Sequence, residues 1–505
     1  MKKQILFLML ILGISCISHA QKTSFHTSKA PAPEAGTMFI YPERIHLENG
    51  DFYNAERASM FVPLNRSVEN SDVISLDVYR FKATEKADPN TPPIFFLHGG
   101  PNFLGLEDML DEPGFFEKRW KFMLDVADVV VVSQRGIGPS KPTTLIENKI
   151  PALSPDKAYN EEEAVEQLQT MLTKGRKTWE DLGVDLNGFT VFEADEDIND
   201  VRKAFGYDKI TIWGGSFGSH WGMTLMRSHP EIIERAILRG MEGVDHTYDH
   251  PGHTWNVYKR MAKEAESSEE LKGYIPECGL IRAVEIIVER LTENPVTVKV
   301  KNPVTNKMQK VLFDGHSAKQ LSRGYSNSLE AWPSDIITMY NGDFTKAAEK
   351  AVKKYNNSGR SFKTASYYML DCGSGITAER LKEYMADPAN KVLETGWGYR
   401  NGCPCWESDN GDEFRTNFET NIPTLIVQGT WDRSTPYENA LELAPYFKDL
   451  KFVTLKRGPH GAIRAAYDYS EEFKAGILKF AESGDSSGLD DEMELPKLKW
   501  VIPEK

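Results

Sequence analysis

Short runs of apolar residues recur along the chain and predict buried β-strands. The clearest lie at residues 94–97, 129–132, 210–213, 236–238, 424–427 and 452–455. Such runs are typical of strands covered on both faces in a parallel sheet. Segments with helical periodicity separate some of them, as at 197–204 and 438–443. The alternation predicts an α/β fold in which crossover helices flank a mostly parallel sheet.

The pattern changes between residues 245 and 415. This stretch has charged helical segments at 259–271, 283–291 and 345–354, and it lacks clear buried strands. We therefore expect a large, mainly helical cap at 245–415, inserted between a first core part at 38–244 and a second at 416–505. Near the C-terminus, KLKWVIP suggests a short strand at the edge of the sheet.

One serine stands where a predicted strand turns into a predicted helix. KITIWGGSFGSHWG places Ser216 in a G-x-S-x-G pattern. Such a turn is so sharp that its flanking positions tolerate almost no side chain, and the serine hydroxyl is left exposed above the sheet. The backbone N–H of Phe217 then begins the helix and points to where an oxyanion would form. Ser216 is the predicted nucleophile; the alternative is a structural turn serine.

A serine nucleophile needs a histidine base and a carboxylate that orients it. In this type of fold both follow the serine, each on a loop after a strand. TLIVQGTWDRSTP supplies Asp432, and KFVTLKRGPHG supplies His460. The rival acids lie within or beyond the next helix: Asp449, Glu438 and Glu442. We predict Ser216, Asp432 and His460 as a catalytic triad, a chemistry that needs no cofactor or metal.

The second oxyanion donor is expected in a glycine-rich turn after an early strand. IFFLHGGPN provides that turn, and we assign the donor to the N–H of Gly100. His98 is expected to support the turn through hydrogen bonds.

LHGGPN, VVVVSQRGIGPS and DINDVRKAFGYDKITIWGGSFGSHWG together resemble the proline iminopeptidase and tripeptidyl aminopeptidase branch of the α/β-hydrolases. QGTWDRSTPYENA and RGPHG are similar to the C-terminal part of that family. The resemblance covers about 90–245 and 415–465, and it implies a serine exopeptidase that acts on short peptides with free N-termini. Two positions depart from the family pattern: Ser133 replaces an aspartate and Asn102 replaces a glycine.

A peptide ammonium requires a carboxylate near the site, since an unpaired buried charge is costly. Glu242 follows the strand RAILRG, and the family resemblance makes it our candidate for amine binding. The alternative is an acid that pairs with Arg239 or faces solvent. The nearby HTYDHPGH suggests a metal site, but Pro251 interrupts the spacing that helical ligands need.

Two other functions fit parts of this pattern. An esterase or lactonase would use the same triad, because fold and triad do not distinguish amides from esters. A catalytically inactive binding protein is disfavoured by the retention of every catalytic element. A dehalogenase or epoxide hydrolase is disfavoured because the turn carries serine instead of aspartate.

The N-terminal residues MKKQILFLMLILGISCISHA have the layout of a secretory signal peptide at 1–20. The apolar run is shorter than the roughly 20 residues that span a bilayer. We expect an exported protein, periplasmic or extracellular, with a flexible leader at 21–37. Cleavage before a lipidated Cys16 is the alternative, although the residues before Cys16 match that signal only loosely.

The chain beyond residue 20 keeps Cys278, Cys372, Cys403 and Cys405. An even number in an exported protein predicts two disulfides, with Cys403 and Cys405 each bonded to Cys278 or Cys372. A zinc site is the competing interpretation, but no C-x-x-C pair is present.

The formal charge is −14, and it becomes −16 without residues 1–20, which contain Lys2 and Lys3 and no acids. An acidic surface without a basic cluster repels phosphate, so we do not expect a nucleic-acid partner.

Overall fold

The computed structural model describes residues 33–101, 106–112, 114–138, 140–146, 154–357 and 363–504. The predicted signal peptide, Cys16, most of the predicted leader and Asn102 lie outside the described residues. Glu34–Lys505 form one compact unit. No helix in the described part of the chain is long and apolar enough to cross a membrane.

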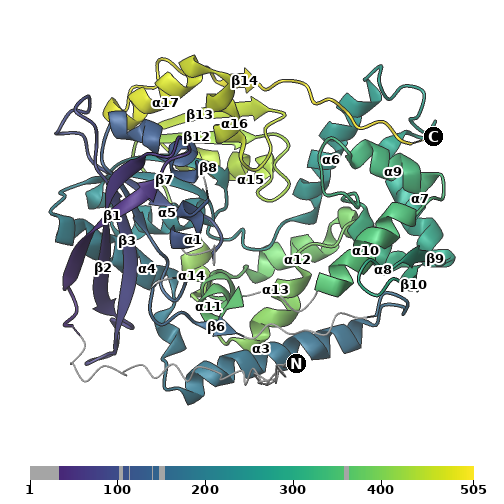
Figure 1. Cartoon of the computed structure of the whole chain (residues 1–505), viewed down its shortest axis with the longest axis horizontal. Helices are drawn as coiled ribbons and strands as arrows, with labels where there is room; N and C mark the ends of the chain where they lie inside the picture. Colours follow the sequence, from purple (N-terminus) through teal and green to yellow (C-terminus); the bar gives the residue numbers. More distant parts are fainter. Residues whose placement is uncertain are drawn as a thin grey trace, which may run out of the picture. The chain divides into compact units, whose positions relative to one another are not determined.

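A ten-stranded sheet organises the core, in the order β1-β2-β3-β5-β4-β7-β8-β12-β13-β14 (Figure 1). The strands from β5 to β14 in that order are parallel, whereas β1, β2 and β3 are antiparallel to their neighbours. The prediction of a mostly parallel sheet is confirmed. The strands are β1 Met38–His46, β2 Phe52–Pro63, β3 Val73–Phe81, β4 Ile94–Leu97, β5 Val129–Val132, β7 Ile210–Ser216, β8 Ile233–Met241, β12 Thr424–Gly429, β13 Leu450–Lys456 and β14 Glu492–Glu494.

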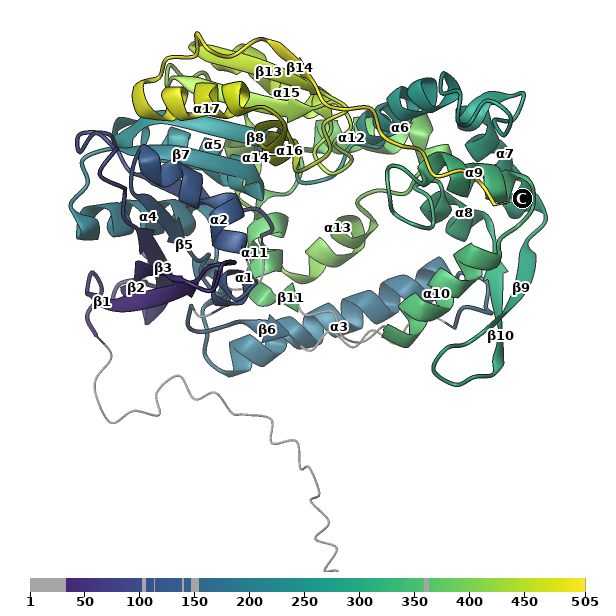
Figure 2. The same cartoon turned by 45° about the horizontal axis from the view of Figure 1, so that its top comes forward.

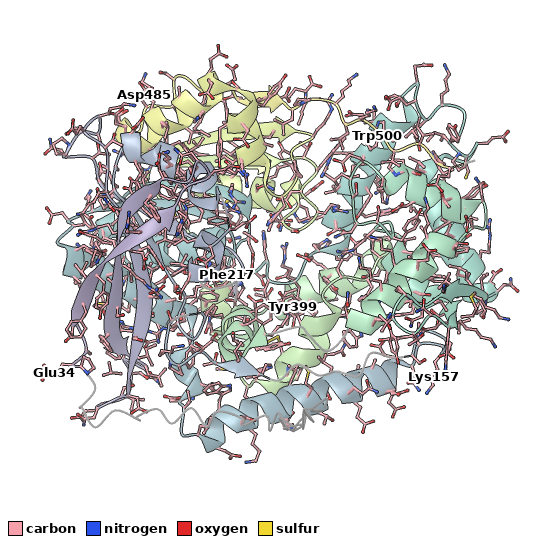
Figure 3. All side chains as sticks on the ribbon, in the orientation of Figure 1. Glu34, Lys157, Phe217, Tyr399, Asp485 and Trp500 are labelled. Carbon is pink, nitrogen blue, oxygen red and sulfur yellow. A yellow bond between two sulfur atoms is a disulfide. The ribbon has the colours of Figure 1, made fainter. Side chains whose placement is uncertain are left out.

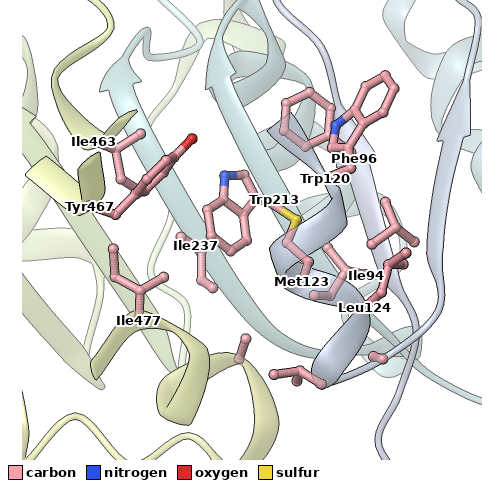
Figure 4. Close-up of a cluster of buried hydrophobic side chains, with 14 of the residues drawn as sticks. Ile94, Phe96, Trp120, Met123, Leu124, Trp213, Ile237, Ile463, Tyr467 and Ile477 are labelled. Atoms are coloured by element: carbon pink, nitrogen blue, oxygen red, sulfur yellow. The ribbon is translucent and has the colours of Figure 1, made fainter. Parts of the chain in front are cut away.

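Helices cover both faces of the sheet. On one face, Trp213 and Ile237 pack with Trp120 and Tyr467 in a continuous apolar cluster (Figure 4). On the other, a Cβ on Gly222 of α5 would lie only 3.3 Å from the Leu238 side chain and 3.4 Å from that of Ile212, so this glycine lets the helix pack closely on the sheet. The helices of the core are α1 Leu106–Leu110, α2 Phe115–Arg119, α4 Val191–Phe205, α5 Phe217–Ser228, α15 Tyr437–Leu443, α16 Ala462–Tyr469 and α17 Glu471–Ser483.

The stretch predicted as a cap is mainly helical and has a buried cluster that includes Trp332 and Leu291 and extends to Trp431 and Trp500 outside it. It also contains a hairpin of β9 and β10, which the sequence did not reveal because its strands are half exposed. The long helix α3 (Glu161–Asp181) runs beside α13 (Figure 2). The cap elements are α6 Pro251–Glu266, α7 Gly279–Glu293, β9 Val296–Lys301, β10 Met308–Phe313, α8 Gly315–Leu321, α9 Trp332–Tyr340, α10 Thr345–Asn357, α11 Ala365–Ser374, α12 Ala378–Ala386, α13 Trp397–Gly402 and α14 Gly411–Arg415.

A two-stranded ladder joins core and cap sequences. β6 (Leu145–Ile146) pairs antiparallel with β11 (Lys363–Thr364).

Two sequence predictions are wrong in detail. The edge strand is β14, at Glu492–Glu494, and not KLKWVIP, because Trp500 is instead buried among the cap helices. The described residues contain one disulfide, Cys372–Cys403, and not two. Cys278 is exposed at the start of α7, and the thiol of Cys405 points to the Gln169 carbonyl of α3, so these two cysteines lie on different elements.

Candidate active site

Ser216 is the last residue of β7, and α5 begins at the next residue. Its φ of 57° and ψ of −134° are rare for any residue with a side chain. A Cβ on Gly214 would lie 2.3 Å from the Gly218 carbonyl oxygen, and one on Gly218 would lie 2.0 Å from that of Leu97. The glycines of the motif are therefore a steric requirement of this strand-to-helix turn.

The turn after β4 lies against the serine. A Cβ on Gly99 would stand 3.0 Å from the Cβ of Ser216 and 3.6 Å from its Oγ. Gly100 has a φ of 129°, which favours glycine, and a cis peptide bond leads to Pro101. His98 Nδ1 lies 3.0 Å from the Gly99 carbonyl oxygen. The roles of Phe217 and Gly100 as oxyanion donors stay predictions.

Asp432 and His460 lie within hydrogen-bonding distance. His460 Nδ1 is 2.9 Å from Asp432 Oδ2, and the carboxylate also accepts hydrogen bonds from the N–H groups of Ser434 and Thr435 and from the Thr435 hydroxyl. Asp432 is 1% exposed, whereas the His460 side chain is 37% exposed. With Nδ1–H directed to the carboxylate, Nε2 remains available to accept a proton.

Neighbouring strands bring the serine and the histidine to the same end of the sheet. Ser216 of β7 pairs with Met241 of β8. One residue earlier on β8, a Cβ on Gly240 would lie 3.3 Å from His460 Cε1 and 3.5 Å from Asp432 Oδ2. Arg239 donates a hydrogen bond to the His460 carbonyl oxygen at 3.2 Å.

Glu242 is linked by hydrogen bonds to the turn that carries Ser216. Its N–H donates to Ser219 Oγ, which in turn donates to the Ser216 carbonyl oxygen. Burial, with the nearby charges of Asp371 and Asp249, raises the pKa of Glu242 well above its usual value. Within the described ranges, Glu242 makes no ion pair with Arg239 or any other cation.

Two further acids share this environment. Burial is the main cause that raises the pKa of Asp249 to about 6 and that of Asp371 to about 7. Asp371 comes from cap helix α11 and accepts a hydrogen bond from the hydroxyl of Tyr399 on α13. Figure 3 labels Tyr399 and Phe217, which come from the cap and the core. Sequence reasoning missed Asp371, because nothing local to α11 relates it to a serine on another element.

Two histidines of HTYDHPGH contact a carboxylate in the second part of the core. His246 Nε2 and His253 Nε2 lie 3.1 and 3.2 Å from the two carboxylate oxygens of Glu442 on α15. Among the described residues, no group of His, Cys, Asp and Glu side chains is arranged to hold a metal ion. These histidines thus connect the start of the cap to the second part of the core.

His220 connects the nucleophile helix to the cap. Its Nδ1 lies 3.0 Å from the Gly243 carbonyl oxygen, and its Nε2 lies 2.9 Å from Ser374 Oγ, at the end of α11. The ring is fully buried, which lowers the pKa of His220 to about 4. The folded state therefore favours the neutral form of the ring.

We expect this histidine to make the protein less stable in acid. Its pKa is lower in the folded than in the unfolded state, so the stability it contributes is present above about 6.5 and is lost as pH falls toward the folded value. The loss corresponds to about 3 kcal/mol of unfolding free energy between pH 7 and pH 4. Urea unfolding of the parent and of His220→Asn measures this, and the variant should show a shallower pH dependence. Equal slopes would contradict it.

Comparisons with known proteins agree with this geometry. Residues 92–272 match the α/β hydrolase fold family, and residues 390–470 match the TAP-like protein family. The proline iminopeptidase of Neisseria gonorrhoeae is 26% identical over 382 residues, which cover 76% of this chain and 87% of the relative. Serine protease Hip1 of Mycobacterium tuberculosis is 21% identical over 420 residues, which cover 76% of this chain and 77% of the relative.

These similarities cover the turn that carries Ser216 and the loops that carry Asp432 and His460. The expectation of an α/β-hydrolase fold is confirmed by the family matches and by the parallel sheet. The chain has the α/β-hydrolase fold and is a serine hydrolase, similar to proline iminopeptidase, serine protease Hip1 and the TAP-like proteins.

Proposed function

We propose that this serine peptidase is an exported aminopeptidase that cleaves short peptides near their free N-termini. The observation that carries the proposal is a group of three buried acids, Glu242, Asp249 and Asp371, whose charges raise one another's pKa. Lys363 and Arg323 partly offset the charges of Asp371 and Asp249, whereas Glu242 has no cation beside it among the described residues. A buried carboxylate is costly without a counter-charge, and a substrate ammonium would supply one. The Cys372–Cys403 disulfide and the signal-like N-terminus support export.

The proposed mechanism proceeds through an acyl-enzyme. Ser216 Oγ attacks the scissile carbonyl carbon while His460 Nε2 takes the hydroxyl proton, and Asp432 stabilises the imidazolium. The N–H groups of Phe217 and Gly100 hold the oxyanion. His460 then gives its proton to the leaving amine, and the C–N bond breaks. Water, deprotonated by the same histidine, hydrolyses the ester and releases the N-terminal fragment.

Within this proposal, residues 38–244 and 416–505 form the catalytic core, and the cap at 245–415 limits entry to short peptides. Its α11 would bring Asp371 to the substrate's N-terminal side, opposite the triad.

We expect Glu242→Gln to lower kcat/KM for free-amine arylamides about 10- to 100-fold, the value of one charge-assisted hydrogen bond. Turnover of a short-chain ester without an amine should change little, because that substrate does not use the carboxylate. Glu407→Gln is the matched control, since Glu407 is exposed on the cap and pairs with Arg176.

The function itself is tested by offering the parent prolyl, alanyl and tripeptidyl arylamides with free and acetylated N-termini, beside the ester. Loss of cleavage on acetylation would support an aminopeptidase. Which of the free-amine arylamides is cleaved would show how many residues are released. Ester turnover with no amide turnover would refute the proposal in favour of an esterase or lactonase.

A further inference from the structure

The loops that carry Asp432 and His460 are joined by their backbones. A Cβ on Gly429, at the end of β12, would lie 2.2 Å from the Gly458 carbonyl oxygen, so the two loops touch there. The Trp431 N–H donates to that oxygen at 2.9 Å, and the Thr430 N–H donates to the Leu455 carbonyl oxygen at 3.0 Å. A displacement of one loop is therefore transmitted to the other.

Arg457, three residues before His460, contacts this junction through its backbone and connects it to α6 and the C-terminal tail through its side chain. Its φ of 62° is left-handed, a conformation that is unfavourable for a residue with a side chain. Its N–H donates to Thr430 Oγ1 at 3.0 Å. Its guanidinium binds Glu264 Oε1 of α6 at 2.6 Å, the Leu495 carbonyl oxygen at 2.5 Å and the Glu494 carboxylate. The side chain is 10% exposed, so these contacts are largely shielded from water.

The same cap helix also contacts the aspartate loop. Arg260 Nε donates to the Thr430 carbonyl oxygen at 2.9 Å, and its two Nη atoms bind Glu438 at 2.7 and 3.2 Å. Arg260 and Glu264 are four residues apart on α6, so they lie on one face of the helix. The first helix of the cap thus contacts the loops of both Asp432 and His460.

The C-terminal tail makes a second connection between cap and core. After β14 it crosses to the cap helices, as both views show (Figures 1 and 2). Trp500 is 5% exposed, and its ring centroid lies 6.0 Å from that of Trp431, the residue before Asp432. Farther along, the Val501 N–H donates to the Glu330 carbonyl oxygen at 3.0 Å.

We propose that Arg457 is a positioning residue through which cap helix α6 and the C-terminal tail set the geometry of the Asp432–His460 pair. The inference rests on the proposed triad. Without the guanidinium, the contacts to α6 and the tail are lost, and only the backbone hydrogen bonds of the junction oppose relaxation of the left-handed residue. The His460 loop then shifts relative to Asp432. Because a misplacement of about 1 Å can cost roughly 100-fold in rate, a small shift here is enough to slow acylation.

The test compares Arg457→Gln, Arg457→Lys and Glu264→Gln with the full-length parent. Two readouts are used: steady-state hydrolysis of a free-amine arylamide across pH, and the rate at which a fluorophosphonate labels Ser216. Labelling requires the activated serine but no peptide recognition. Arg282→Gln is the control, because Arg282 pairs with Glu285 and Glu289 on the exposed face of α7.

We expect Arg457→Gln to lower kcat and the labelling rate together, by about 10- to 100-fold, with KM within about 2-fold of the parent. The pH dependence of kcat should also change, because the hydrogen bond between Asp432 and His460 is altered. Lysine should restore part of the rate, and Glu264→Gln should show a smaller loss in the same direction. The control should match the parent.

Unchanged kcat and labelling in folded Arg457→Gln and Glu264→Gln would overturn the inference, even if their melting temperatures fell. Failure of the proposed function looks different: the parent would be labelled at Ser216 yet cleave no arylamide, and labelling rates would still test Arg457. A parent that is not labelled at all would overturn both.

Discussion

Ser216→Ala is expected to lower kcat for every substrate by on the order of 10⁶-fold, because the nucleophile and its base act as one unit. The residual rate would come from oxyanion stabilisation and binding alone. The substitution removes only Oγ from a half-buried position and leaves the turn glycines in place, so the fold should persist. Arylamide hydrolysis and circular dichroism, measured on the same preparation, check both statements.

Fluorophosphonate labelling is a second, independent test of the same prediction. Mass spectrometry should find the adduct on the peptide that contains Ser216 in the parent and no adduct in the variant. Ser483→Ala, an exposed serine at the end of α17, is the matched control and should label like the parent. Persistent labelling and turnover in Ser216→Ala would remove this residue from the mechanism.

The strands of the core could be predicted because the apolar runs that indicate them are local in the sequence. All six predicted strands are present, and each is longer than or equal to its apolar run. Parallel strands end at the same edge of a sheet, so the order of serine, acid and histidine was enough to expect them together. The sharp turn before the helix could be predicted as well, because residues 214 and 218 of the motif must be glycines where the strand passes directly into a helix.

Other features could not be predicted because they depend on contacts distant in sequence. Strand β1 carries exposed Phe39 and Tyr41, so it lacks the pattern of a buried strand. The disulfide count was misjudged because parity says nothing of which thiols approach each other. Asp371 joins Glu242 only because α11 folds back onto α5, where His220 meets Ser374.

Asp432→Asn is expected to lower kcat about 10⁴-fold with little change in KM. The asparagine oxygen can still accept the N–H bonds of Ser434 and Thr435, so the loop should keep its shape. Its amide nitrogen would then face His460 Nδ1, which must become an acceptor. The proton moves to Nε2, and the histidine can no longer take the proton of Ser216.

The pH profile separates this tautomer effect from simple damage. Activity of the asparagine variant should rise further at alkaline pH, where Ser216 needs less help to lose its proton, while the parent, with its histidine base intact, should level off. Asp449→Asn is the matched control, because Asp449 is an exposed acid and was the rival assignment on the sequence. If Asp449→Asn lost activity and Asp432→Asn retained it, the acid of the triad would be reassigned. If both retained it, the histidine would be oriented by its loop alone, and the hydrogen bond at 2.9 Å would have no catalytic role.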